Sequence, residues 1–230
     1  MKAGIIAAGE GSRLKSEGIG VLKPLVSVDG IPLIERLITT FIHNGITEIV
    51  CIVNAYSLEV KEFVEKKNFS IPIQFVIKTT PSSMHSLFAL SRYLKDDVFL
   101  LTTVDSIFRE EEFARYLLHA QHQRADGVLA VTNFIDDENP LYVQMDQTLR
   151  IQSFSKSEQS LWVTGGLYIF HPRIFQEIDK VLEQKIERLR NFLSYLLLHG
   201  YALEGFPFSK IIDVDHARDI HVAEELLRTH

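Results

Sequence analysis

Cysteine, tryptophan and proline are scarce in this chain of 230 residues, which contains 1, 1 and 7 of them. One cysteine cannot form an intramolecular disulfide, so no disulfide framework holds the fold. Cys51 lies within the apolar run of residues 49–53, where a buried packing thiol is expected. We therefore expect a reducing, cytoplasmic setting. The few prolines and the 46% of hydrophobic residues exclude disordered and low-complexity classes.

Positive charge is also in deficit, with 24 Lys and Arg against 30 Asp and Glu and a formal net charge of −6. No bulk positive field attracts a nucleic-acid backbone or an anionic membrane surface, so neither is expected as a partner. Long apolar runs are absent, since no window approaches the ~18 residues of a membrane span. The apolar start is interrupted at residues 9–13, too early for a signal-peptide core.

Short apolar runs alternate with segments of helical period through the first half of the chain. This alternation predicts an α/β fold in which crossover helices connect parallel strands. After about residue 135, strands follow one another without helices, which indicates an antiparallel extension. The length fits one domain, and no repeat or linker divides the chain. The expected strands are 3–7, 49–53, 73–77, 98–103, 128–132, 141–145, 149–154, 163–170, 202–206 and 211–214, and the expected helices are 34–43, 58–67, 83–94, 110–123, 173–199 and 217–228.

A glycine-rich segment follows the first predicted strand and reads Ala-Ala-Gly-Glu-Gly-Ser-Arg-Leu over residues 7–14. Glycines at the end of a parallel strand expose backbone N–H groups to a ligand, a geometry that suits phosphate oxygens. Arg13 and Lys23 add fixed positive charge. The alternative is a tight turn with solvated basic residues. The dinucleotide fingerprint is excluded because Leu14 stands where it needs glycine, and the P-loop spacing is absent.

Residues 6–14, followed by Lys-Pro-Leu at 23–25, resemble the signature of the nucleotidyltransferase family with a GT-A-like fold. This family contains the sugar-phosphate nucleotidylyltransferases and their small cytidylyltransferase relatives. Residues 28–34 match the segment that usually follows. The resemblance implies one nucleotidyltransferase domain over residues 1–230. It also implies a Rossmann-like, three-layer α/β/α fold with a mixed, mainly parallel sheet and a small antiparallel extension.

The resemblance further implies an enzyme that transfers a nucleoside monophosphate from a nucleoside triphosphate to a small phosphorylated acceptor, most directly a sugar 1-phosphate. The products would be an NDP-sugar and pyrophosphate. Arg13 would hold the departing phosphates, and Lys23 would counter charge at the α-phosphate, which makes them the two catalytic residues. The nucleotide-binding residues implied in this way are Ala8, Gly9, Gly11, Ser12, Arg13, Lys23, Ser82 and Ser83.

Two further regions correspond to ligand-contacting segments of the family. Ser82 and Ser83 would contact the base, or they cap the predicted helix 83–94. Lys156, Gly165 and Gly166 would bind the acceptor, because glycine in a strand lets a ligand lie against the backbone. A solvated loop lysine is the alternative for Lys156.

Carboxylates that could hold Mg²⁺ follow two predicted strands. Asp105 comes just after strand 98–103, at the sheet edge where ligands collect, although it could instead cap the next helix. The second ligand is Asp213 or Asp215, and the resemblance favours Asp215. Asp219 is interpreted as an acid in the first turn of the last helix. A zinc site at His216 is discounted, because no second His or Cys has ligand spacing.

Other functions remain as alternatives to the sugar-nucleotide hypothesis. One is CTP-dependent transfer to a phosphorylated alcohol such as phosphocholine, and a weaker one is nucleotide transfer to a molybdenum cofactor. A third, from a different class, is a non-catalytic relative that senses nucleotides. Binding alone would not require a pair of metal-binding acids, so the presence of Asp105 and Asp215 favours an enzyme.

Overall fold

The computed structural model describes residues 1–136, 138–157 and 160–228 and contains a sheet of nine strands. Its parallel part has the order β5-β4-β1-β6, with Lys2 of β1 opposite Glu48 of β4 and Phe99 of β6. Helices connect these strands, as the alternation of apolar runs predicted. The bounds are β1 (Lys2–Ala7), α2 (Leu33–His43), β4 (Glu48–Val53), α3 (Leu58–Lys67), β5 (Ile73–Ile77), α4 (Ser83–Leu94) and β6 (Phe99–Thr103).

The antiparallel extension is built around the long strand β11. One edge of β11 pairs antiparallel with β6 and the other with β8, while its beginning pairs with β9. The sheet is therefore mixed, as predicted. However, β8 does not continue the parallel series, because β11 separates it from β6. The bounds are β8 (Gly127–Thr132), β9 (Tyr142–Met145), β10 (Ile151–Ser155), β11 (Trp162–Phe170) and β12 (Leu203–Phe208), the last of which is parallel to β8.

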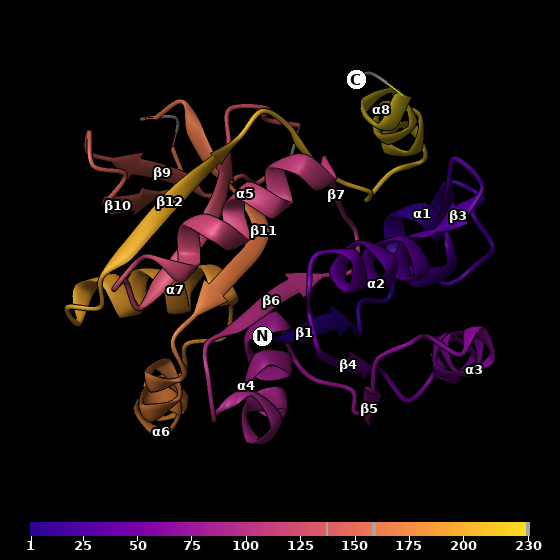
Figure 1. The fold of residues 1–230 in the computed structure, drawn as a ribbon, viewed down its shortest axis with the longest axis horizontal. Coiled ribbons are helices and arrows are strands. Elements are labelled where there is room, and N and C mark those ends of the chain that lie inside the picture. Colours follow the sequence, from indigo (N-terminus) through magenta and orange to yellow (C-terminus); the bar gives the residue numbers. More distant parts are fainter. Residues whose placement is uncertain (137, 158–159, 229–230) are drawn as a thin grey trace.

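Helices cover both faces of the sheet, which confirms the three-layer architecture (Figure 1). Successive residues of a strand face opposite sides, so Ile5 packs in one hydrophobic cluster and Ile6 in the other. The first cluster includes side chains of α2, α3 and α5, and the second includes side chains of α4, η2, α6 and α7. The bounds of those not yet given are α5 (Glu110–Gln121), η2 (Pro172–Glu177), α6 (Ile178–Glu183) and α7 (Leu189–Leu198).

The single long helix predicted over 173–199 is wrong, because this segment forms η2, α6 and α7. Lys185 adopts a left-handed backbone conformation with φ 55°, which ends α6. The amide of Ile186 then donates to the carbonyl of Val181 at 3.1 Å. Neither glycine nor proline marks this break in the sequence, so the local signal for a helix end was absent.

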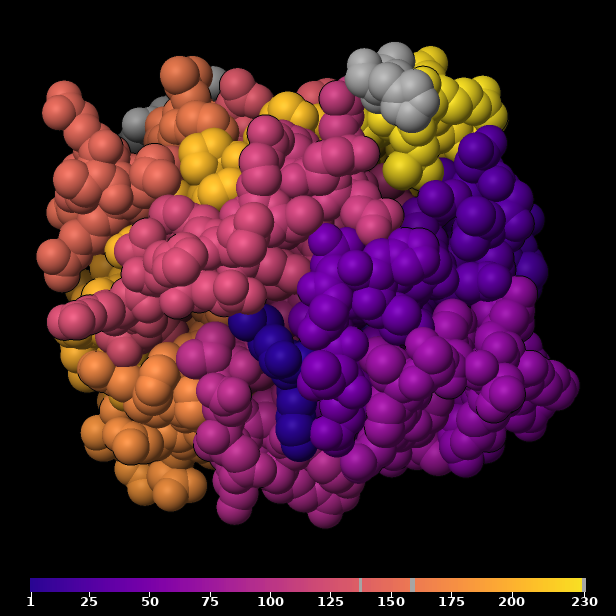
Figure 2. Space-filling model, viewed as in Figure 1, coloured from indigo at the N-terminus to yellow at the C-terminus, as the bar shows by residue number. Residues whose placement is uncertain are grey.

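A third hydrophobic cluster joins the last helix to the amino-terminal quarter of the chain. Leu226 of α8 packs in this cluster with Leu14 and Val28. Figures 1 and 2 show α8 lying against this region, at the upper right. The segment 9–23 lies outside the predicted helices and strands, but it contains a short helix. The bounds are α1 (Ser12–Ser16), η1 (Lys23–Leu25), β2 (Ser27–Val28), β3 (Ile31–Pro32), β7 (Ser106–Phe108), β13 (Ile211–Asp213) and α8 (Ala217–Arg228).

Cys51 is buried in the core, as its apolar surroundings predicted, and burial raises the pKa of its thiol to about 12. Within the described part of the chain, no helix has the length and apolar character needed to cross a bilayer.

Candidate active site

The glycine-rich segment leaves β1 and turns into α1. Gly11 has φ 59°, a left-handed conformation, and a Cβ there would lie 2.9 Å from Lys23 Cβ. A Cβ on Gly9 would meet no atom within 4 Å. Glycine is therefore required at position 11 by the protein itself, whereas the space beside Gly9 is open to a ligand. Leu14 is buried and anchors α1.

Lys23 holds two carboxylates together. Its side chain is 9% exposed, and its ammonium donates to Asp105 and to Asp215 Oδ1, the latter at 2.5 Å. Burial alone would lower the pKa of Lys23, but the two carboxylates outweigh it and raise the pKa above its ordinary value. In turn, burial would raise the pKa of Asp105, and Lys23 lowers it. Lys23 thus favours the ionised form of Asp105.

Strand pairing explains why acids so distant in sequence meet. Asp105 lies in the turn between β6 and β7, and β7 pairs antiparallel with β13. Asp213 is opposite Ser106 and accepts a hydrogen bond of 2.8 Å from its hydroxyl. The amide of Val214 donates to the carbonyl of Asp105 at 3.0 Å, which brings Asp215 to Lys23. The helix-cap alternative for Asp105 is wrong, because α5 begins only at Glu110.

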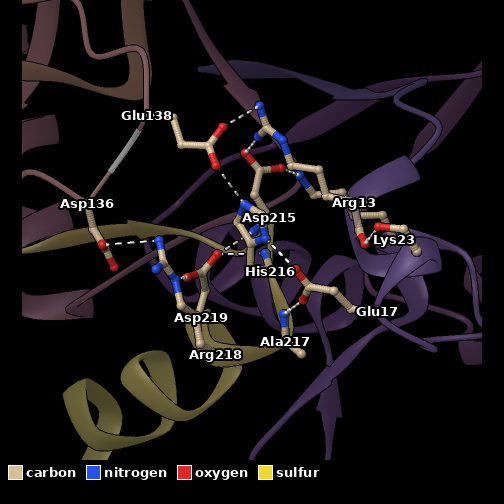
Figure 3. Close-up of polar contacts among 11 residues, drawn as sticks. Arg13, Glu17, Lys23, Asp136, Glu138, Asp215, His216, Ala217, Arg218 and Asp219 are labelled. Atoms are coloured by element: carbon tan, nitrogen blue, oxygen red, sulfur yellow. Dashed lines mark hydrogen bonds and ion pairs between the residues drawn. The ribbon is translucent and has the colours of Figure 1, made fainter.

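Arg13 connects this group to a second set of ion pairs (Figure 3). Its Nη1 donates to Asp215 Oδ2 at 2.8 Å, and its Nη2 lies 3.7 Å from Glu138 Oε2. His216 lies on the other side of Glu138, with Nε2 3.6 Å from Oε1. The two predicted cations, Arg13 and Lys23, therefore share Asp215.

Glu17 ties the end of α1 to the start of α8. Its carboxylate accepts from the amide of Ala217 at 2.6 Å and lies 2.5 Å from His216 Nδ1. The hydrogen bond to Glu17 raises the pKa of His216, and the same bond lowers the pKa of Glu17. Asp219 accepts from the amides of Asp215 and His216 at 2.9 and 2.6 Å. This confirms the interpretation of Asp219 as an acid of the first helical turn.

A first cleft of about 380 Å³ lies at the carboxyl ends of β1, β4, β5 and β6. In open parallel sheets this edge is where ligands bind. Lys23 and Asp105 lie at this cleft together with uncharged hydroxyl and backbone groups. The lining residues are Ile6, Ala8, Gly9, Glu10, Lys23, Asn54, Tyr56, Thr79, Thr80, Pro81, Ser82, Ser83, Ser86, Thr103, Val104 and Asp105.

The predicted base-contacting serines both line the first cleft. Ser82 occupies the N-cap position of α4, but its side chain makes no capping hydrogen bond; its Oγ lies 2.9 Å from His85 Nδ1. Thr80 Oγ1 and Ser86 Oγ lie 2.6 Å apart. A contact between these serines and a base stays a prediction.

A second cleft of about 50 Å³ includes Asp213, Asp215 and Arg13 in its lining. Gly165 also lines it, and a contact between Gly165 and an acceptor stays a prediction. A Cβ on Gly165 would lie 2.3 Å from Ile211 Cδ1, so a larger residue there would displace the Ile211 side chain of β13. The lining residues are Arg13, Thr132, Phe134, Ile135, Asp136, Glu138, Pro140, Val163, Thr164, Gly165, Ile211, Ile212, Asp213, Asp215, His216 and Asp219.

Four predicted ligand-contacting residues line neither of these clefts, and one of them is Gly11. Lys156 is exposed just after β10, and Ser12 is exposed at the start of α1. Gly166 has φ 78°, and a Cβ there would lie 2.5 Å from Ser106 Oγ, so this glycine lets β11 pack against β7. Their roles toward an acceptor or a nucleotide stay predictions.

Several residues of the site were not predicted from the sequence. Asn54 and Tyr56 follow β4, and the rule that ligands collect at strand ends could have found them. Glu17 and Glu138 make ion pairs with residues far away in the chain. No local pattern identifies such partners.

Comparison with known proteins identifies the family of the chain. The model of the nucleotidyl transferase family matches residues 2–229. The chain belongs to this family. Among its relatives, the mannose-1-phosphate guanyltransferases of Gibberella zeae and Schizosaccharomyces pombe are 25% and 24% identical to it, each over 90% of this chain. The chain spans only 59% and 60% of the length of these two nucleotidyl transferases.

Solved structures match over nearly the whole chain. The inositol-1-phosphate CTP transferase of T. maritima aligns with a TM-score of 0.83 and 20% identity, covering 99% of this chain and 96% of that one. A putative glucose-1-phosphate thymidylyltransferase of Bacillus anthracis aligns with a TM-score of 0.86 and 19% identity, covering 100% and 96%. At these identities the match establishes the shared fold.

Proposed function

We propose that this protein transfers a nucleoside monophosphate from a nucleoside triphosphate to a sugar 1-phosphate, with Mg²⁺ as cofactor and pyrophosphate as the second product. The observation that carries this proposal is the meeting of Asp105 and Asp215 on the ammonium of Lys23. Asp105 lines the first cleft and Asp215 the second. A Mg²⁺ ion held by these acids would therefore supply positive charge to anions bound in both clefts.

The two acids fit a magnesium ion. Asp105 Oδ1 is buried and has no hydrogen-bond partner, so one carboxylate oxygen remains to be satisfied. Among the described residues no cluster of three or more His, Cys, Asp or Glu side chains could hold a metal. Mg²⁺ does not need one, since it commonly takes one or two carboxylates and completes its shell with waters and substrate phosphates. When bound, it would supply positive charge that neutralises phosphate oxygens.

The positively charged side chains of Arg13 and Lys23 would supply the remaining charge stabilisation. The open backbone at Gly9 receives the triphosphate, and Arg13 exchanges its carboxylate partners for the departing phosphates. Lys23 stays next to the α-phosphate and balances the charge of the attacking phosphate oxygen. Since the nucleophile is already an anion, catalysis requires positioning and fixed positive charge rather than a general base.

Two classes of acceptor are supported as candidates. The mannose-1-phosphate guanyltransferases, which match most of this chain, support a sugar 1-phosphate. The inositol-1-phosphate CTP transferase, of which 96% is covered by the structural match, supports the second candidate, transfer from CTP to a phosphorylated alcohol.

The experiment is a matrix of nucleoside triphosphates and acceptors in which pyrophosphate release is measured with Mg²⁺. The acceptors are mannose 1-phosphate, glucose 1-phosphate, inositol 1-phosphate and phosphocholine. We expect release that needs both a triphosphate and a sugar 1-phosphate and stops when EDTA removes the metal. Release with an alcohol phosphate alone would support the second candidate. Binding of triphosphate without release for any acceptor would contradict an enzyme and favour a nucleotide sensor.

Asp105→Asn tests the metal role of the buried acid. We expect pyrophosphate release to be abolished while the circular dichroism spectrum stays that of the folded protein, because Lys23 keeps its bond to Asp215. Asp96→Asn, which changes an exposed acid in the turn between α4 and β6, is the matched control. Substantial activity in Asp105→Asn would contradict the proposed role of Asp105 in metal binding.

A further inference from the structure

Tyr56 is the most exposed large hydrophobic side chain next to either cleft. It is 85% exposed, yet it contributes to the wall of the first cleft. A tyrosine that packs against the core would be mostly buried, because an aromatic ring gains free energy when it leaves water. The ring of Tyr56 is therefore presented to solvent at the mouth of the cleft, with most of its surface uncovered.

The turn that carries Tyr56 is held by buried polar contacts. Asn54 is 5% exposed, and its Oδ1 accepts from the amide of Tyr56 and the hydroxyl of Ser57, both at 2.9 Å. Its Nδ2 donates to the carbonyl of Ala8 at 3.3 Å, which fastens the turn to the end of β1. The backbone under Tyr56 is thus fixed relative to the glycine-rich segment.

The first cleft has a charged end and an uncharged end. Its charged lining residues are Glu10, Lys23 and Asp105. Tyr56 belongs to the other group, together with the hydroxyl-rich residues 79–83. The two segments of this group adjoin each other, since the amide of Lys78 donates to the carbonyl of Val53 at 2.9 Å and that of Ala55 reaches Thr79 Oγ1 at 3.5 Å.

We propose that Tyr56 is a nucleotide-binding residue whose ring stacks on the base of the bound nucleoside triphosphate. This inference rests on the proposed function, which puts the triphosphate at the charged end of the cleft. The base then extends toward the uncharged end, where a flat π-face is available and hydroxyl groups can reach the base edge. Stacking accepts any base, so Tyr56 supplies affinity, and the residues of segment 79–83 supply selectivity.

The test measures dissociation constants by calorimetry for wild type, Tyr56→Ala and Tyr56→Phe, without acceptor. The ligands are the nucleoside triphosphates that the wild type binds and inorganic tripolyphosphate, which has the phosphates but no base. We expect Tyr56→Ala to weaken nucleoside triphosphate binding by about 10-fold or more. Tripolyphosphate binding should not change, and Tyr56→Phe should restore the affinity because it keeps the ring.

Leu58→Ala is the matched control, since Leu58 is 45% exposed two residues further on and lies outside the lining of the first cleft. It should bind nucleotide as the wild type does. Equal nucleotide affinity in Tyr56→Ala and wild type would overturn the stacking role and leave the proposed function intact. Equal weakening of tripolyphosphate and nucleotide would also overturn it, because the loss would then arise from a disturbed phosphate site. Failure of the wild type to bind any nucleoside triphosphate would instead contradict the proposed function.

Discussion

Lys23 is the side chain on which the candidate site depends most, because it is buried and bonded to both acids. We predict that Lys23→Ala lowers kcat by roughly 100-fold, equivalent to about 3 kcal/mol, since a positioned charge near the transition state is lost. Steady-state pyrophosphate release checks this. Lys15→Ala, which removes an exposed lysine of α1, should keep wild-type kinetics. A near-native kcat in Lys23→Ala would show that Lys23 is not a catalytic residue.

The raised pKa of Asp213 predicts that the free energy of unfolding depends on pH. Desolvation of its carboxyl group and the negative charge of Asp105 raise its pKa to about 7, from an ordinary value of 3.8, although the residue as a whole is exposed. The folded state then binds the proton more tightly than the unfolded state, so this contribution to stability is complete below pH 4 and is lost as the pH rises through 7. The loss is about 1 kcal/mol, because solvent at the cleft screens the charge.

Asp213→Asn removes this titration and can still accept the hydrogen bond from Ser106. The free energy of unfolding in urea, measured at pH 5 and pH 8, should fall less between these values in the variant than in the wild type. Identical differences in the two proteins would show that Asp213 titrates normally.

At the residue scale, the sequence predicted the parts of the site that lie in short motifs. Gly9, Arg13 and Lys23 belong to one such motif, and Asp105 follows an apolar strand. The partners of these residues could not be predicted, because they depend on strand pairing over long separations. Glu138 illustrates this: nothing near it in the sequence indicates that it lies beside Arg13.

Within the glycine-rich segment, Gly11 and Gly9 have different roles. We predict that Gly11→Ala lowers the free energy of unfolding by roughly 1–2 kcal/mol and weakens nucleotide binding, because φ 59° is unfavourable and the new Cβ meets Lys23. Gly9→Ala should leave stability unchanged and weaken only nucleotide binding, since its Cβ would point into open space. Urea denaturation and calorimetry check both. Equal stability losses in the two variants would contradict this division.

Elements with a strong local period were predictable, whereas β7 and the interrupted helical segment 173–199 were not. The parallel strands and helices α2 to α5 agree with the apolar periodicity to within a few residues. The strand β7 was missed because its three residues show no period of their own and are defined by pairing with β13. The break at Lys185 was missed because a non-glycine residue adopts the left-handed conformation there.

For the whole molecule, ligand binding should appear as added thermal stability. At 100 times the dissociation constant, a ligand that binds only the folded state adds about 2.7 kcal/mol. In a protein of this size that raises Tm by roughly 5–10 °C. We predict such a shift for the preferred nucleoside triphosphate with Mg²⁺ and a much smaller one for the same nucleoside without phosphates. Equal shifts for both ligands would contradict phosphate recognition at the glycine-rich segment.

The contact between α8 and the amino-terminal quarter has a consequence for biosynthesis. The glycine-rich segment is synthesised long before Asp215 and the helix that packs over Leu14. During translation Lys23 therefore lacks one of its two carboxylate partners until residue 215 has been made. A nascent chain stalled before β13 would carry the motif without Asp215, so the pair of acids around Lys23 forms only after residues 211–228 have left the ribosome.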